Sequence, residues 1–300
     1  MDKNLSQKIS EYSHFFSHMQ DIKEIDHIEG QFFGFLVQDI KNYDFSGIAV
    51  IENRMAISFG VFDVLYPICR KVIFGSQNLT NEEFEARLEE INLASRIILC
   101  LNGEMNSAIN RRLRMLELNL IKNIEEELHF VKLLTLKFKK SSALWYYRQK
   151  LIKKYFDEKG VSKEEVEKRI TFEDGIIEEF LVKYPRNYYG WGYKKFLIDE
   201  YIIKSDYNDL LWKEYLKIKE YCEKNVHNFS AFHLLGTLTY KIAKKENKEN
   251  MIKEQITWAN NLIKKYEDLY LLESLEVKDK GIKYHELESV KRFLVIMKKF

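Results

Sequence analysis

The 300-residue chain contains only two prolines and twelve glycines. Because proline and glycine punctuate folds made of short strands and tight turns, their scarcity argues against a β-rich fold and predicts long helices. The composition also excludes a disordered chain, since 46% of the residues are hydrophobic and 14% are aromatic, enough to form a core. At this length the chain forms either two ordinary domains or one elongated array.

An excess of charge of one sign is also lacking. The 48 basic and 46 acidic side chains leave a net charge of +2, which gives no support to a nucleic-acid-binding surface. Cys69, Cys100 and Cys222 are far apart and odd in number, which predicts reduced thiols in an intracellular protein. The first ten residues lack an apolar signal core, and no run approaches the ~18 apolar residues of a membrane span. We therefore expect a soluble cytoplasmic protein with no membrane span and no nucleic-acid partner.

Aromatic residues, by contrast, are abundant and recur in one frame. The stretch KYPRNYYGWGYKKF, residues 183–196, aligns with FKKSSALWYYR, residues 138–148, when the two tryptophans are superimposed. A basic residue follows three positions after each tryptophan. The frame gives five pairs, of which the last is degenerate: Ile109 and Arg112, Trp145 and Arg148, Trp191 and Lys194, Phe232 and Leu235, Leu272 and Leu275. Their separation of about forty residues is typical of a two-helix solenoid unit.

This period predicts an all-α fold, a right-handed α–α superhelix of about five helix hairpins of ~40 residues each. Residues 81–275 would form the repeats and residues 276–300 a capping helix. Residues 1–80 would form a non-repeat segment, in which GIAVIE is extended before a helix that begins near Ser58.

Polar residues mark where the second helix of each hairpin begins. Asn187 is a good N-cap in the third repeat, Ser141 or Ser142 in the second, and Asn228 or Ser230 in the fourth. Upstream, Asn78 or Thr80 is expected to cap one helix that runs through residues 81–101. The simplest interpretation of the large rings near these starts is packing between neighbouring hairpins. It applies to Trp145, Tyr147, Trp191, Tyr193 and Phe232.

No motif describes a complete active site on this chain. His14 and His18 are four residues apart, but a third metal ligand is missing, and the glycines form no phosphate-binding loop. We expect no metal or other cofactor on this chain. The acidic pairs Glu125–Glu127 and Glu178–Glu179 are interpreted as surface charges of helices. Residues 154–169 and 244–255 are interpreted as solvated helix ends and connections.

The repeat resembles that of protein prenyltransferase α subunits, whose signature is roughly Asn-Tyr-x-x-Trp-x-x-Arg. Residues 187–194 match it, with Lys194 in place of the arginine, and the second repeat keeps Trp145 and Arg148. Residues 46–74 are also similar to the segment that precedes the repeats in one branch, the prenyltransferase α-subunit repeat-containing proteins. The resemblance covers roughly residues 45–275.

The resemblance implies that the helix pairs wrap a separate β subunit, which holds the zinc ion and the prenyl diphosphate. The α-type chain would be part of a transferase only as a heterodimer. For the repeat-containing branch it implies a Rab-type β subunit. The reaction would then be geranylgeranyl transfer to a cysteine in the C-terminal region of a protein that is already farnesylated.

The resemblance implies a catalytic role for two residues. Arg186 and Tyr188 occupy positions that face the diphosphate in farnesyl- and type I geranylgeranyltransferase α subunits, where lysine is usual at the first position. Cations and hydroxyl donors there stabilise the leaving group. The alternatives are an exposed loop cation for Arg186 and a packing role for Tyr188.

A second function class stays open. Leu235 and Ile109 stand where the family prefers arginine and tryptophan. These apolar residues fit a helical-repeat scaffold that binds other proteins and has no role in prenylation.

Overall fold

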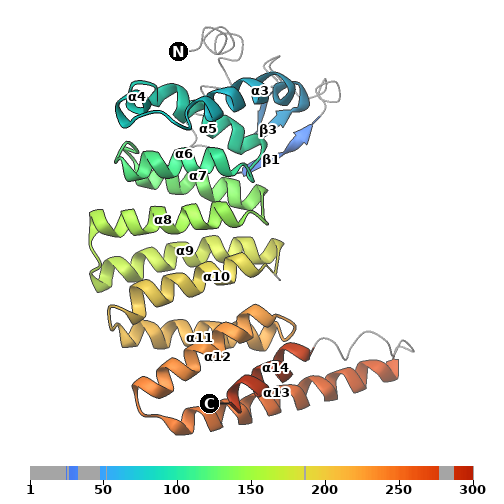
Figure 1. Ribbon diagram of the computed structural model, residues 1–300. Helices are drawn as coiled ribbons and strands as arrows, with labels where there is room; N and C mark the ends of the chain where they lie inside the picture. Colours follow the sequence, from blue (N-terminus) through green and yellow to red (C-terminus); the bar gives the residue numbers. More distant parts are fainter. Residues whose placement is uncertain are drawn as a thin grey trace. The chain divides into compact units, whose positions relative to one another are not determined.

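The computed structural model describes residues 25, 27–32, 48–51, 53–185, 187–276 and 287–299. The chain divides into two compact units, residues 1–160 and 161–300. The fold is an all-α helical repeat, as predicted, built from consecutive antiparallel helices (Figure 1). In the described part of the chain, no helix is long and apolar enough to cross a membrane.

The first unit begins with a small sheet that lies outside the repeats. Its strands are β1 (His27–Phe32), β2 (Ile48–Ile51) and β3 (Arg54–Ser58), in the order β1-β3-β2. Strand β3 pairs in parallel with β1 and antiparallel with β2. Asn53, with φ at 63°, forms the tight reversal between β2 and β3. The extended segment and the following helix, α3 (Phe59–Gly75), were both predicted.

In the described residues of the first unit, five helices follow α3. They are α4 (Asn81–Ala86), α5 (Leu88–Leu101), α6 (Asn106–Glu117), α7 (Ile124–Lys137) and α8 (Ser142–Lys159). Thr80 caps α4 in a capping box with Glu83. The single helix predicted for residues 81–101 is wrong, because it is broken at Arg87. The Arg87 N–H bonds to the carbonyl of Phe84 at 3.2 Å, a three-residue closure that ends α4.

The described residues of the second unit form helices. They are α9 (Lys163–Lys183), α10 (Tyr188–Leu197), the π-helical segment η3 (Ile198–Ile203), α11 (Asn208–Lys224), α12 (Phe229–Lys245), α13 (Glu249–Glu276) and α14 (Glu288–Met297). Helix α9 ends just before Pro185, which cannot continue it. Position 272, expected to begin a second helix in the fifth repeat, instead lies inside the uninterrupted α13. The helix that follows and packs on both α12 and α13 is α14.

The recurring apolar residues occupy one structural position. Ile109, Trp145, Trp191 and Phe232 are each the fourth residue of their helix, α6, α8, α10 and α12 respectively. Their exposed fractions are at most 5%. Tyr147 and Tyr193 are likewise fully buried. The packing interpretation of these rings is therefore confirmed, and the repeat frame read from the sequence coincides with the helix starts.

Candidate functional site

In two repeats, the residue that caps the second helix also bonds to the repeat before it. The Ser141 hydroxyl accepts a bond from the first turn of α8 and donates to the carbonyl of Gly103 at 2.8 Å. The side-chain oxygen of Asn228 caps α12 by accepting from the N–H of Ala231. Its side-chain NH2 group donates to the backbone carbonyl of Pro185 at 2.6 Å. Gly103 and Pro185 both lie two residues before the N-cap of their own second helix. The cap residues thus fix the turns of neighbouring hairpins.

A buried carboxylate lies between the hairpins of the first unit. Glu127 in α7 receives bonds from the guanidinium of Arg112 in α6, with Nε at 2.5 Å, and from the hydroxyl of Tyr147 in α8 at 2.9 Å. Arg112 also donates to the side chains of Asn92 at 3.0 Å and Ser95 at 2.9 Å. Arg96 in α5 donates to Glu127 as well, at 3.4 Å. The prediction of a surface position is wrong for Glu127, which is only 1% exposed, because partners from three other helices converge on it.

The opposite charges of Glu127 and Arg112 stabilise each other's ionised form. Burial alone would raise the pKa of Glu127, but the adjacent Arg112 guanidinium lowers it below its usual value. Burial opposes the charge on Arg112 in the same way, and Glu127 outweighs it, so that the pKa of Arg112 is raised. Burial, and then Glu127, raise the pKa of Tyr147 well above its usual value, so the phenol remains a donor.

The same glutamate position recurs along the chain. Glu127, Glu173 and Glu214 each lie 18 residues before the ring of their repeat and are at most 3% exposed. The Tyr193 hydroxyl donates to Glu173 at 2.8 Å, as Tyr147 does to Glu127. Arg169, from the same helix as Glu173, donates to it at 2.6 Å and is buried, so the predicted solvation of residues 154–169 is wrong at this position. This spacing is the sequence signal that could have identified the buried acids.

The basic residue of the third repeat lies in a cluster of two cations and two anions. Lys194 in α10 contacts both Asp174 in α9 and Glu214 in α11. Lys217 donates to the same two carboxylates, at 2.9 Å and 2.8 Å. Burial opposes the charge on Lys217, but the hydrogen bonds that it donates to Glu214 and Asp174 hold its pKa above the usual range. The four charges therefore sum to zero.

A cavity of about 480 Å³ opens beside this cluster. We call it the α9–α11 recess. Its apolar wall is formed by Ile177, Leu181, Val182, Trp191, Ile218 and Tyr221, and its polar end by Asp174, Lys194 and Lys217. Val182 at its edge is 81% exposed. The tryptophan and the basic residue of the repeat signature, both buried to 5% exposure, thus form part of the recess lining.

The predicted repeat-motif residues occupy the helix interfaces. Ile109, Arg112, Trp145, Arg148, Trp191, Lys194 and Phe232 are all buried. Arg148 donates to the backbone carbonyl of Leu128 at 2.7 Å, a bond between two helices. At the equivalent position of the fourth repeat, Leu235 is fully buried and has no group that could donate such a bond.

Of the two residues predicted to face a diphosphate, the structure describes one. Tyr188, the first residue of α10, is 72% exposed. Arg186 lies outside the described residues. Asn187 caps α10, accepting bonds from the N–H groups of Tyr189 at 2.8 Å and Gly190 at 3.3 Å. Tyr188 is therefore held at the start of a capped helix with its ring in solvent, and its catalytic role stays a prediction.

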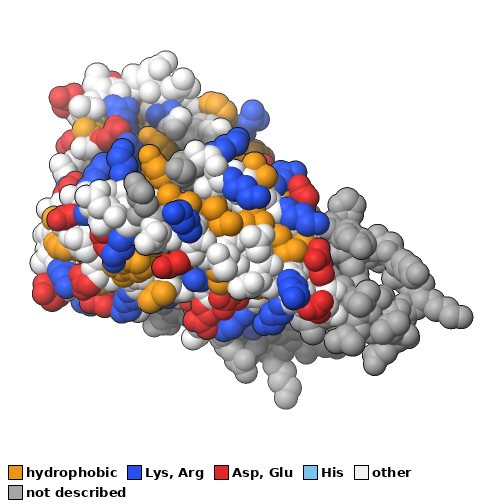
Figure 2. All heavy atoms as spheres, turned by 90° about the horizontal axis from the view of Figure 1, so that it is seen from below, with side chains coloured by type: hydrophobic (Ala, Val, Ile, Leu, Met, Phe, Trp, Pro, Cys, Tyr) orange, Lys and Arg blue, Asp and Glu red, His pale blue; other side chains and the backbone are white. Residues whose placement is uncertain are grey.

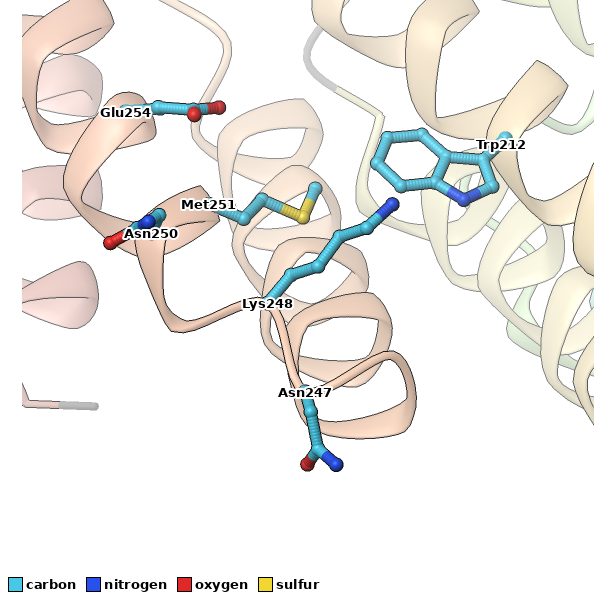
Figure 3. A pocket seen from close by; sticks show the side chains of 6 residues that line it. All are labelled: Trp212, Asn247, Lys248, Asn250, Met251 and Glu254. Atoms are coloured by element: carbon cyan, nitrogen blue, oxygen red, sulfur yellow. The ribbon is translucent and has the colours of Figure 1, made fainter.

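A second cavity, of about 690 Å³, lies where α12 is joined to α13 (Figure 3). The Lys248 ammonium points toward the ring of Trp212, 4.9 Å from its centroid, whereas Asn247 points away. Glu246 accepts bonds from both Trp212 and Lys248, each at 2.6 Å. The lining of this cavity is mostly polar, whereas the α9–α11 recess has an apolar wall with a few polar groups, so the recess is the better candidate for a binding site.

The described residues contain no group of three or more metal-ligating side chains close enough to hold an ion. His14 and His18 lie outside them. The three cysteines are buried, and burial raises the pKa of both Cys69 and Cys100 to about 12. These thiols are therefore poor nucleophiles at neutral pH.

One repeat of the chain matches a known protein family. Residues 124–155 match the family described as Protein prenyltransferase alpha subunit repeat. The match spans α7 and most of α8 and includes Glu127, Trp145, Tyr147 and Arg148. No curated protein matches the chain significantly. The chain is therefore similar to prenyltransferase α subunits through this repeat.

Proposed function

We propose that the protein is the α-type subunit of a protein prenyltransferase, inactive alone and active as a heterodimer with a β subunit. The observation that carries the proposal is the match of residues 124–155 to the family's repeat. The same arrangement recurs in α9 and α10, where Trp191 is again the fourth helical residue and Tyr193 again bonds a buried glutamate. The second of these two repeats thus has the same helix geometry and buried hydrogen bond as the repeat that matches the family.

In this proposal the β subunit supplies the zinc ion, which activates the thiol of the substrate cysteine, and binds the prenyl diphosphate. The role of the α-type chain is to complete the mouth of that site. As the carbon–oxygen bond to the diphosphate breaks, negative charge develops on the leaving group, and a hydroxyl donor placed there lowers the barrier. Tyr188 is exposed and its backbone is fixed by the Asn187 cap. We assign it this donor role, together with Arg186.

We further propose a Rab-type β subunit and geranylgeranyl transfer to a cysteine in the C-terminal region of a cytoplasmic protein. Support comes from the N-terminal segment, which resembles the repeat-containing branch in sequence. In the structure this segment includes β2, β3 and α3 and precedes the first hairpin.

Co-expression with the β subunits of the three known classes tests this function. We expect the Rab-type subunit alone to co-purify, the heterodimer to transfer a labelled isoprenoid, and the isolated chain to transfer none. Tyr188→Phe should lower transfer about tenfold while heterodimer formation is unchanged. Tyr146→Phe, at a tyrosine 49% exposed in α8, is the matched control. Failure of every β subunit to bind would overturn the proposal.

The protein-binding scaffold remains the second candidate, favoured by the buried Leu235, which cannot provide the tie of the repeat arginine. Asn187 and Tyr188 reach the surface, as the prenyltransferase function requires, but Trp191 is buried. A stable native complex that contains no β subunit and shows no isoprenoid transfer would establish the scaffold function instead.

A further inference from the structure

The α9–α11 recess is a feature that the packing of the repeats does not require. Asp174, Ile177, Glu178, Leu181 and Val182 follow the helical spacing of 3.6 residues and line it from one face of α9. Most other apolar positions of α9 are buried against neighbouring helices, whereas Val182 is 81% exposed. Val182 thus extends the apolar wall of the recess to its solvent-exposed edge.

The charges of the recess define what it can accept. Lys194 and Lys217 are each bonded to both Asp174 and Glu214, so these four charges cancel. Glu178 adds one uncompensated negative charge at the mouth. It is exposed, and within the described residues it forms no ion pair. The recess therefore combines an apolar wall with a single acidic edge.

We propose that the α9–α11 recess binds a segment of a partner protein that inserts an aliphatic or aromatic side chain beside a lysine or arginine. The inserted side chain would contact Ile177, Val182 and Trp191, and the adjacent cation would pair with Glu178. A volume of about 480 Å³ suits such an insertion, since ligand pockets span roughly 300–1,000 Å³. An anionic or wholly apolar segment fits less well, because it would leave Glu178 repelled or unpaired.

Tyr188 does not line the recess, so this proposal does not depend on the catalytic role proposed for Tyr188. The face seen in Figure 2, which belongs to the end of the molecule at α13, carries an interrupted band of hydrophobic side chains with lysines and arginines on both sides. On that face the apolar groups are separated by charged side chains.

Selection of a random peptide library on the full chain tests the proposal. We expect the recovered peptides to carry Leu, Ile or Phe next to Lys or Arg. Affinity should fall at least about tenfold, or 1.4 kcal/mol, on Glu178→Lys and on Val182→Gln. The matched controls are Glu267→Lys in α13, which changes the net charge equally, and Val295→Gln in α14, a valine 55% exposed. They should change affinity less than twofold.

A charge reversal decides whether Glu178 is the partner of the cation. A recovered peptide whose Lys or Arg is replaced by Glu should lose binding to the unmodified chain and regain it on Glu178→Lys. All the substituted side chains are exposed, so the variants should fold, and circular dichroism verifies this. The proposal is overturned if no peptide is recovered, if peptides bind all variants equally, or if reversal fails to restore binding. Self-association lost in Glu178→Lys would identify a second copy as the occupant and also overturn it.

Discussion

The two units place different chemistry at the same position of the repeat. In the first, Arg112 bridges the hairpins through Glu127, and both side chains are buried to 1% exposure or less. In the second, Lys194 bridges them through Asp174 and Glu214, and the accompanying Lys217 is 39% exposed. One cluster is closed to solvent and the other lies open at the edge of a recess.

The difference follows from the shape of the cation. A guanidinium has a planar fork of donors that binds both oxygens of one carboxylate and still reaches Asn92 and Ser95. An ammonium group has three donors and no fork, and Lys194 divides them between Asp174 and Glu214. A second lysine then balances the second acid. The repeat position is thus purely architectural when arginine occupies it, and it can contribute to a binding surface when lysine does.

The largest effect is expected from Glu127→Gln in the closed cluster. It leaves Arg112 buried without its counter-charge, a change that costs about 3–5 kcal/mol. Urea unfolding of the full chain, with hydrogen exchange to resolve α6–α8, measures this cost. Glu125→Gln, an exposed acid two residues earlier, should change the free energy of unfolding by less than ~0.5 kcal/mol.

The effect of Glu127→Gln on the free energy of unfolding should depend on pH in one direction. Because the pKa of Glu127 is lowered in the folded state, its contribution is complete above the unfolded carboxyl pKa of about 4.3. It is lost as the pH falls through the lower folded value. The stability difference between the unmodified chain and Glu127→Gln should therefore be constant near neutrality and shrink below about pH 4. A difference that grew on acidification would contradict this account of the cluster.

A smaller effect is expected from Lys194→Met in the open cluster. Asp174 and Glu214 keep Lys217 as a partner, and solvent reaches the cluster, so we expect a loss of about 1–3 kcal/mol. Lys195→Met is the control, since Lys195 is 41% exposed and pairs with Asp199, four residues further along the chain. If Lys194→Met cost as much as Glu127→Gln, the two clusters would be equally closed and the comparison would fail.

The helix starts of the repeats were predictable because local rules determine them. Asn187, Ser141 and Asn228 are strong caps, and a ring three residues into each second helix marks the hairpin interface. The buried acids were not predicted, because an isolated glutamate in a charged helix is usually solvated. Only the recurring spacing of 20 residues, which joins Glu127 to Tyr147 and Glu173 to Tyr193, distinguishes these acids in the sequence.

Other features depend on packing that no local pattern encodes. Strand β1 is short and was not expected, since its pairing with β3 joins residues 27–32 to residues 54–58 across a long segment. The α9–α11 recess is formed by three helices and exists only once they are packed. The roles of Arg186 and Tyr188 belong to this class too, because they depend on a second protein.

The smallest effect concerns the two cap residues, which perform the same task with different atoms. Ser141 uses one oxygen both to accept from α8 and to donate to Gly103, whereas Asn228 accepts through its oxygen and donates to Pro185 through its amide nitrogen. Asn228→Ser keeps the cap of α12 but shortens the side chain, so the bond to Pro185 is lost. We expect a cost of about 0.5–1.5 kcal/mol and faster hydrogen exchange in the first turn of α10. Asn228→Ala removes the cap as well and should cost ~1 kcal/mol more. Equal stability of the serine variant and the unmodified chain would show that a serine there bridges the turns as Ser141 does, and that the amide is dispensable.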